Sequence, residues 1–309
     1  MIALREAAGI ALTRLAEKYP DFVVLDADIA GGTGMHHFRV AHPDRFIQCG
    51  IAEQNMMGIA AGLATCGFIP FVTSFSVFLS MRALEQARTT VAYPRLNVKI
   101  IGAHPGLDTG PDGVSAQAIE DIGIYRSVPG FVVISPCDQI EVDKALEAML
   151  NYDGPVFMRT GRSPVPNVCS DDYQFEIGKG VVLEEGGDVT IMATGIMVHT
   201  ALEAAAIMKK DGVSVRVVNI STVKPIDKDL IVRCAGETAG IVTVEDHNKY
   251  GGLGSAVAQV MATNNLTGLE IIAIDDVFGE SGEAPELHQK YGLNTESIIA
   301  AAARLLKKG

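Results

Sequence analysis

The chain has 309 residues, of which 48% are hydrophobic and 20% are charged, and its formal net charge is −12. A chain of this length and composition can fold into two domains with large cores, and it is not disordered. It contains no block of basic residues for nucleic acid and no apolar run of about 18 residues for a membrane span. No nucleic acid or membrane partner is therefore expected. The amino-terminal residues lack the pattern of a secretory signal, which predicts a cytoplasmic location.

Five cysteines are dispersed along the chain and form no CxxC pair. Their number is odd, and their spacing fits neither a zinc site nor a disulfide framework. The sequence therefore predicts buried free thiols in a reducing compartment. The cysteines are Cys49, Cys66, Cys137, Cys169 and Cys234.

Short runs of β-branched residues alternate with helical patterns along the first half of the chain. Several of these runs are apolar on both faces, which is typical of parallel strands covered by helices on both sides. The expected strands span 22–29, 69–75, 98–104, 131–135 and 155–160. Helices are expected to begin near Glu53, Phe78, Ala116 and Asp138.

The alternation breaks at residues 162–174, where two prolines indicate a linker, and then resumes. Further strands are expected at 189–193, 213–220, 240–246 and 269–274, with helices near His199, Asp227, Ser255 and Asn294. The predicted fold is α/β, with two three-layer α/β domains, the first with a parallel sheet. The predicted boundaries are 1–165 and 176–309, joined by a linker at 166–175.

Two loops near the carboxyl ends of predicted strands are candidate sites, because ligands of open α/β sheets bind there. Glu53 opens a helix that continues with small and apolar residues. Its carboxylate either complements the helix dipole or has a raised pKa in a low-dielectric site, where it can share a proton with a ligand. Phe75 and Phe78 flank a strand-to-helix turn. They form either a flat wall for a heterocycle or ordinary core packing.

Two more loops carry polar side chains suited to anions or hydroxyls. His104 and Asp112 lie in a loop rich in glycine and proline. They can bind sugar hydroxyls or phosphate, or they can be a structural histidine and an ordinary turn residue. Arg162 follows another strand, and Arg5 lies near the amino terminus. Each is either a phosphate ligand or a solvated cation.

Common catalytic and nucleotide-binding motifs are missing from the sequence. The glycines at 251–254 lack both the GxGxxG spacing and the lysine of a phosphate loop, and they predict a tight strand-to-helix turn. There is no HExxH, no GxSxG and no clustered set of histidines and cysteines. No metal-binding residues are therefore expected in this chain.

Taken in order, the loop motifs resemble those of the transketolase family, and the resemblance extends from about Arg5 to the carboxyl terminus. In the first half they are Ala27-Asp28, Gly50-Ile51-Ala52-Glu53-Gln54-Asn55-Met56, Thr73-Ser74-Phe75, Gly110-Pro111-Asp112-Gly113, Ser135-Pro136-Cys137-Asp138 and Asp153-Gly154-Pro155. In the second half they are Ile191-Met192-Ala193-Thr194-Gly195, Lys224-Pro225-Ile226-Asp227, Val244-Glu245-Asp246-His247 and Gly279-Glu280-Ser281-Gly282.

The resemblance covers the pyrimidine-binding and C-terminal domains of the family and implies thiamine diphosphate as cofactor. Transketolases hold the diphosphate and Mg²⁺ in a preceding domain, through a Gly-Asp-Gly stretch and a downstream asparagine that this sequence lacks. The resemblance therefore implies a split transketolase, in which a separate N-terminal subunit supplies that domain. Two copies of each chain are expected, since two-fold symmetry dominates among oligomers.

For the cofactor, the resemblance assigns Glu53 to the aminopyrimidine ring and Phe78, with Phe75 beside it, to stacking on that ring. A protonated carboxyl on the ring nitrogen favours the imino form, whose exocyclic nitrogen can take the proton from thiazolium C2. One position departs from the family. Where many transketolases have a histidine near the cofactor and donor, this sequence has Ala116, followed by Gln117. Members of the animal type have glutamine at that place.

For the substrate, the resemblance assigns Arg5, His104 and Arg162 to the sugar phosphate and Asp112 to a substrate hydroxyl. A serine that commonly helps to bind phosphate is replaced by Gly32, so phosphate affinity or sugar length can differ.

The expected activity is transfer of a two-carbon ketol unit between ketose and aldose phosphates. The alternatives are a 2-oxo acid dehydrogenase beta-type subunit, a fragment related to 1-deoxyxylulose-5-phosphate synthase, and a non-catalytic transketolase-like binding subunit. The loop at 110–113 and the arginines argue against the dehydrogenase subunit. Glu53, Phe78, Asp112 and Arg162 in their matching places argue against the non-catalytic subunit.

Overall fold

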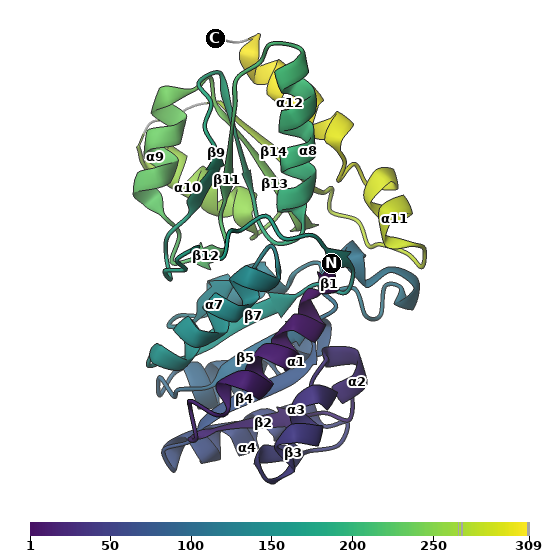
Figure 1. Ribbon diagram of the computed structural model, residues 1–309, viewed down its shortest axis with the longest axis vertical. Coiled ribbons are helices and arrows are strands. Elements are labelled where there is room, and N and C mark those ends of the chain that lie inside the picture. The colour runs from purple at the N-terminus through teal and green to yellow at the C-terminus, as the bar shows by residue number, and fades with distance from the viewer. Residues whose placement is uncertain (265, 267, 308–309) are drawn as a thin grey trace.

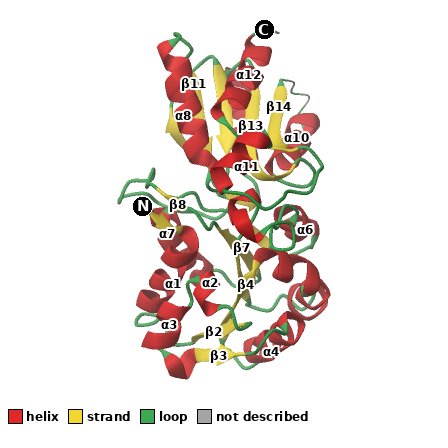
Figure 2. Cartoon of the chain, turned by 90° about the vertical axis from the view of Figure 1, so that its right-hand side faces the viewer, coloured by secondary structure: helices red, strands yellow, loops and turns green. Residues whose placement is uncertain are grey.

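The computed structural model describes residues 1–264, 266 and 268–307. Two α/β domains lie one above the other along the long axis of the molecule, and the amino terminus lies at their junction (Figure 1). Each domain has a central sheet with helices on both sides (Figure 2). The two three-layer α/β domains expected from the sequence are confirmed.

The first domain is built on a seven-stranded sheet in the order β12-β6-β7-β5-β4-β2-β3. Six of its strands are parallel, and β12 joins β6 in antiparallel orientation. The strands are β2 (Phe22–Asp26), β3 (Phe46–Gln48), β4 (Ile69–Phe75), β5 (Lys99–Ala103), β6 (Val132–Ile134), β7 (Val156–Thr160) and β12 (Thr222–Lys224).

Alternate strand residues bury their side chains in two separate cores, one on each face of this sheet. Phe22 and Val24 pack with α1 and α7, whereas Val23 and Leu25 pack with α4 and the helical segment after β4. On the first face lie α1 (Leu4–Leu15), α2 (Ala30–Thr33), α3 (His36–Ala41) and α7 (Gln139–Asn151). On the second face lie α4 (Glu53–Thr65), α5 (Leu84–Gln86) between two π-helical stretches (Phe78–Arg82 and Ala87–Ala92), and α6 (Asp121–Ser127).

The second domain has a five-stranded sheet in the order β14-β13-β10-β11-β9, in which β9 alone is antiparallel among the described strands. The strands are β9 (Val181–Glu184), β10 (Val189–Ala193), β11 (Val215–Asn219), β13 (Ile241–Asn248) and β14 (Leu269–Ile274). The helices are α8 (Met197–Lys210) and α12 (Thr295–Leu306) on one face, α9 (Lys228–Glu237) and α10 (Leu253–Thr263) on the other, and α11 (Ala284–Lys290), which packs against the first domain.

Most expected strands lie where the sequence places them, with differences of a few residues at their ends. The helix expected near Ala116 begins only at Asp121, because residues 113–116 form a turn. Within the break in the pattern at 162–174, and just before the linker predicted at 166–175, β8 (Pro164–Val165) pairs with β1 (Ile2–Ala3). The domain boundaries remain a prediction, and β12, from beyond residue 176, belongs to the first sheet.

The five cysteines are free thiols, but the expectation that all are buried is wrong. Cys137, Cys169 and Cys234 are buried, Cys49 is partly buried, and Cys66 is exposed after the end of α4. Among the described residues, no helix is both long enough and apolar enough to cross a bilayer.

A buried carboxylate on α7 connects the two domains and the segment between them. Glu141 accepts hydrogen bonds from the side-chain amide of Asn219 at 2.9 and 3.0 Å, from the Tyr173 hydroxyl at 2.5 Å and from the Cys137 N–H at 2.7 Å. Because a buried charge is costly unless it is hydrogen-bonded, these donors fix the second domain against α7.

A second buried carboxylate, Asp246 on β13, holds the glycine-rich loop of the first domain. It accepts the backbone N–H groups of Leu107 and Asp108 at 2.9 and 3.0 Å, and His288 Nε2 lies 3.2 Å away. Burial alone would raise the pKa of Asp246, but the hydrogen bond and charge of His288, with Arg159, hold it below its ordinary value. Burial would lower the pKa of His288, but the hydrogen bond and negative charge of Asp246 have the larger combined effect, so the pKa of His288 is raised.

This pair predicts a pH dependence of stability. A histidine whose pKa is raised by folding contributes stability that is complete below its ordinary pKa of 6.5 and is lost as the pH rises through the folded-state pKa. We therefore expect the free energy of unfolding to fall above about pH 6.5 more steeply in the natural chain than in His288→Gln. Urea unfolding between pH 6 and pH 9 measures this, with His42→Gln as the control. Parallel pH profiles for the natural chain and His288→Gln would contradict the assignment.

Candidate functional site

The candidate residues gather because the strands that carry them are neighbours. In the order β7-β5-β4 the carboxyl ends lie at one edge of the sheet, which places Phe75, His104 and Arg162 in adjacent loops. Glu53 opens α4 and faces the end of β4. The site expected from the loop motifs is therefore one continuous region of the first domain, apart from Arg5 on α1.

Glu53 is a buried carboxylate with two donors. Its side chain is 2% exposed. The Ser74 hydroxyl lies 3.4 Å from Oε1, and Arg82 Nη1 donates to Oε2 at 2.8 Å. Because one partner is a cation and the other a hydroxyl, the site can hold Glu53 as a carboxylate. It also leaves the carboxyl group able to bond a nitrogen-bearing ligand in place of Arg82.

Phe75 and Phe78 form a nearly parallel pair beside Glu53. Their ring centroids are 5.9 Å apart with an interplanar angle of 17°, and the His104 ring packs on Phe75 with centroids 4.1 Å apart. Both phenylalanines are only partly buried. Neither ring therefore lies in the fully buried core, and each leaves part of its surface exposed.

Arg82 was not identified from the sequence, although it lies four residues after Phe78 at the end of the π-helical stretch. Its guanidinium lies 4.4 Å from the Phe78 ring centroid while it pairs with Glu53. A planar group with N–H donors thus already fits between the carboxylate and the aromatic face. An aminopyrimidine is also planar, and its amino group and ring nitrogens can hydrogen-bond a carboxyl group, so the residues present fit the ring that the resemblance implies.

The glycine-rich loop brings His104, Asp112 and Arg162 together. Asp112 lies 4.0 Å from His104 Nε2 and 3.9 Å from Arg162 Nη2. The loop is anchored from below, since Asp108 accepts the backbone N–H groups of Arg162 and Ser163 at 2.6 and 3.0 Å. This anchor was also missed from the sequence, because no motif marks a carboxylate that bonds to backbone 54 residues away.

His104 is a neutral side chain at ordinary pH. Burial, with the positive charges of Arg5 and Arg162, lowers its pKa to about 3. Its backbone is in the left-handed region with φ of 60°, which fixes the ring against Phe75. It can therefore donate or accept a hydrogen bond to a ligand without carrying a charge.

Arg5 approaches the same region from α1. Its Nη1 donates to the carbonyl oxygens of Gly31 and Gly32 at 3.2 and 2.9 Å. Arg5 and Arg162 border one cleft of about 640 Å³, which is also lined by Asp108, Ser163 and Glu283. The two arginines can bind an anionic group, although three carboxylates, Glu6, Asp108 and Glu283, line the same cleft.

The structure shows what surrounds Gly32 and Ala116, the two positions that depart from the family. A Cβ atom on Gly32 would lie 2.9 Å from the Phe75 ring, so a serine there requires that ring to move. Ala116 is buried and offers no polar group, whereas the Gln117 amide donates to the carbonyl oxygens of Glu280 and Gly110 at 2.9 and 3.4 Å. Gln117 thus joins the loop to the second domain.

Comparison with known proteins agrees with this architecture. Two family models match: Transketolase, pyrimidine binding domain, over residues 1–167, and Transketolase, C-terminal domain, over residues 178–298. The chain is thus of the class that joins a pyrimidine-binding domain to a transketolase C-terminal domain.

Individual relatives and a solved structure show which members of this class the chain is similar to. A protein of Methanocaldococcus jannaschii described as a putative transketolase C-terminal section is 46% identical over 99% of this chain and 96% of its own length. An apulose-4-phosphate transketolase subunit of Phocaeicola vulgatus is 37% identical over 100% of this chain and 99% of its own. A solved structure described as a split gene transketolase, inactive beta4 tetramer, has a TM-score of 0.93 and 45% identity, with 99% of each chain covered. The chain belongs to the transketolase family, and the resemblance seen in its loop motifs is confirmed.

The depressed pKa of His104 predicts that its imidazole does not titrate between pH 5 and pH 8. ¹⁵N-histidine spectra of the isolated chain measure this, with the His104 signals assigned from His104→Asn. His288, whose pKa is raised, serves as the internal comparison and is expected to titrate above pH 6.5. A His104 shift with a midpoint near pH 6.5 would show that the ring is charged in mildly acidic solution and would contradict the neutral role.

Proposed function

We propose that this chain is a subunit of a thiamine diphosphate-dependent transketolase, which transfers a two-carbon ketol unit from a ketose phosphate to an aldose phosphate. The observation that carries the proposal is the buried Glu53 carboxylate beside Ser74, with a planar donor group between it and Phe78. Thiamine diphosphate, when bound, supplies the electron sink that carbon–carbon bond cleavage next to a carbonyl requires.

Glu53, Phe75 and Phe78 are the residues that would hold the aminopyrimidine. Glu53 would share a proton with the ring nitrogen, which requires Arg82 to release the carboxylate. The side chain of Arg82 is 46% exposed, so it can turn into solvent when the ring takes its place at the buried carboxyl group of Glu53. The two phenylalanines would fix the plane of the ring and exclude water from the carboxyl group.

Arg5, Arg162, His104 and Asp112 are the residues that would bind the sugar phosphate. The two arginines would hold the phosphate in the cleft, the neutral His104 would add an uncharged hydrogen bond, and Asp112 would accept from a sugar hydroxyl. Relatives of this chain are named for different sugars. The name of the Phocaeicola vulgatus relative refers to apulose 4-phosphate, and a 40% identical protein of a Clostridium species is described as a 6-deoxy-6-sulfo-D-fructose transketolase subunit.

We further propose that a separate N-terminal subunit binds the diphosphate and Mg²⁺ and that the active enzyme holds two copies of each chain. Two relatives support a divided enzyme, since one is described as a C-terminal section and the other as one subunit of a transketolase. The similar structure described as an inactive beta4 tetramer supports inactivity of this chain by itself.

The central experiment measures ketol transfer from xylulose 5-phosphate to ribose 5-phosphate with thiamine diphosphate and Mg²⁺. The chain is tested alone and with a candidate partner that carries the Gly-Asp-Gly motif. Activity only in the mixture is expected. A mixture that forms a complex and binds cofactor, yet transfers no ketol unit from any ketose phosphate tested, would overturn the proposed reaction.

Replacing Glu53 with glutamine is expected to lower turnover of the mixture by about 10²- to 10⁴-fold, the usual contribution of a positioned acid–base group. Glutamine has nearly the same size, so complex formation and the circular dichroism spectrum are expected to stay unchanged. Glu85→Gln, at an exposed position of α5, is the matched control. Normal turnover by Glu53→Gln would remove Glu53 from the mechanism.

Replacing Arg162 with methionine is expected to raise KM for phosphorylated sugars by about 10- to 100-fold, since a charged hydrogen bond contributes about 1.5–3 kcal/mol. The value of kcat and the weak activity on unphosphorylated sugars are expected to change little. Arg14→Met, on the exposed side of α1, is the control. An equal loss on phosphorylated and unphosphorylated sugars would show that Arg162 supports the loop and does not bind phosphate.

A further inference from the structure

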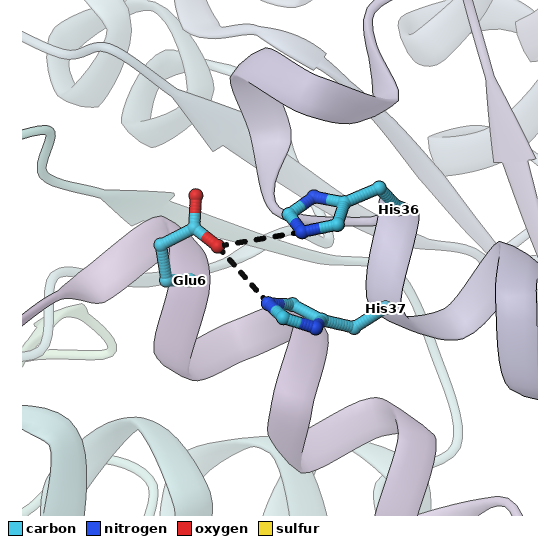
Figure 3. A group of neighbouring side chains, drawn as sticks. All are labelled: Glu6, His36 and His37. Carbon is cyan, nitrogen blue, oxygen red and sulfur yellow. Dashed lines mark hydrogen bonds and ion pairs between the residues drawn. The ribbon is translucent and has the colours of Figure 1, made fainter.

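Outside the residues assigned so far, one carboxylate and two imidazoles meet between α1 and α3. Figure 3 shows the His36 and His37 rings both directed at the same oxygen of Glu6. His37 Nε2 lies 3.1 Å from Glu6 Oε2, and His36 Nε2 lies 4.0 Å from it. One ligand atom from each of the three residues lies within 4.8 Å of the other two. The sequence did not indicate this cluster, because Glu6 and the histidine pair lie far apart along the chain.

The cluster is held by close packing of the backbone. Gly34 precedes α3 with φ of 77°, and a Cβ atom there would lie 2.2 Å from the carbonyl oxygen of Arg5. A Cβ atom on Gly9 would lie 2.0 Å from the carbonyl oxygen of Gly34. Only glycine permits this approach, which brings the first turn of α3 against the first turns of α1. The three side chains are therefore presented by fixed backbone.

Ordinary hydrogen bonding accounts for only part of this arrangement. His37 and Glu6 form a hydrogen bond, but His36 Nε2 is too far from Oε2 to share it. Within the part of the chain that the structure describes, His36 Nδ1 is buried and has no hydrogen-bond partner. The two imidazole rings are also in contact, with centroids 4.0 Å apart, so two charged rings would repel one another.

A metal ion bound to His36 Nε2, His37 Nε2 and Glu6 Oε2 would engage all three side chains at once, with each imidazole binding in its neutral form. Tetrahedral Zn²⁺ with bonds of about 2.1 Å spaces its ligand atoms about 3.4 Å apart, between the observed separations of 3.1 and 4.0 Å. Two histidines and a glutamate are also a known ligand set of zinc sites that keep a fourth position open. We propose that Glu6, His36 and His37 bind one zinc ion.

The surroundings of the cluster suit an exchangeable ion. The three side chains are between 25% and 39% exposed, so an ion can enter and its fourth position can take water or an anion. The second oxygen of Glu6 lies 3.7 Å from Arg5 Nη1, and Glu6 borders the same cleft as Arg5 and Arg162. The ion would therefore add positive charge at the edge of that cleft.

Titration of the untagged full-length chain with Zn²⁺ alone, followed by calorimetry, tests the proposal. One equivalent is expected to bind, and His36→Ala and Glu6→Gln are each expected to weaken binding at least about 100-fold. His42→Ala is the matched control, because His42 follows the same helix and its Nε2 lies 3.0 Å from the carbonyl oxygen of Thr13, away from the cluster. Co²⁺ is a second probe, since the visible absorption of a tetrahedral complex should appear in the control and not in the two variants.

Two results would overturn the proposal. The first is absence of stoichiometric Zn²⁺ binding by the natural chain. The second is binding that persists in His36→Ala and Glu6→Gln but disappears when the exposed thiol of Cys66 is alkylated, which would place the ion at that thiol. Circular dichroism of each variant confirms that it is folded, so that a loss of binding reports the ligand set alone.

Discussion

The site depends on buried carboxylates, which must be satisfied by nearby donors. Asp246, from the second domain, takes the N–H groups of Leu107 and Asp108, and Asp108 in turn takes those of Arg162 and Ser163. Removing one of these acceptors would leave several backbone donors unpaired at once. The shape of the substrate-side loop is therefore set by the contact between the domains and not by the loop sequence alone.

On the cofactor side of the site, Glu53 is also a buried carboxylate that needs a hydrogen-bond donor, but its main donor is of a different kind. Glu53 is as deeply buried as the structural carboxylates, but its strongest partner is a half-exposed side chain and not a fixed backbone group. A carboxylate whose partner can leave is able to exchange that partner for a ligand. This difference in the exposure of the partner separates Glu53 from Glu141 and Asp246, although all three are buried acids.

The local sequence pattern was sufficient to predict the strands of the sheet, but it did not predict contacts between segments that are distant in the sequence. Buried parallel strands such as 98–104 are visible as apolar runs, and the loops after them could be identified because ligands collect at strand ends. Arg82 and the cluster of Glu6 with His36 carry no such mark, and the motif that contains Asp246 did not indicate its contact with the loop, since each depends on helices or domains packing together. The helix expected near Ala116 was misplaced for a related reason: the chain first turns to let Gln117 reach Glu280.

The strand β12 has a consequence for how the polypeptide is made. It lies at residues 222–224 in the chain, yet it forms the edge of the first sheet beside β6. While the ribosome is still adding the intervening residues, the backbone of β6 has an unpaired edge, and such edges invite pairing with other chains. The first sheet is therefore incomplete until residues 222–224 have been synthesised, and until then the exposed edge of β6 can pair with other chains.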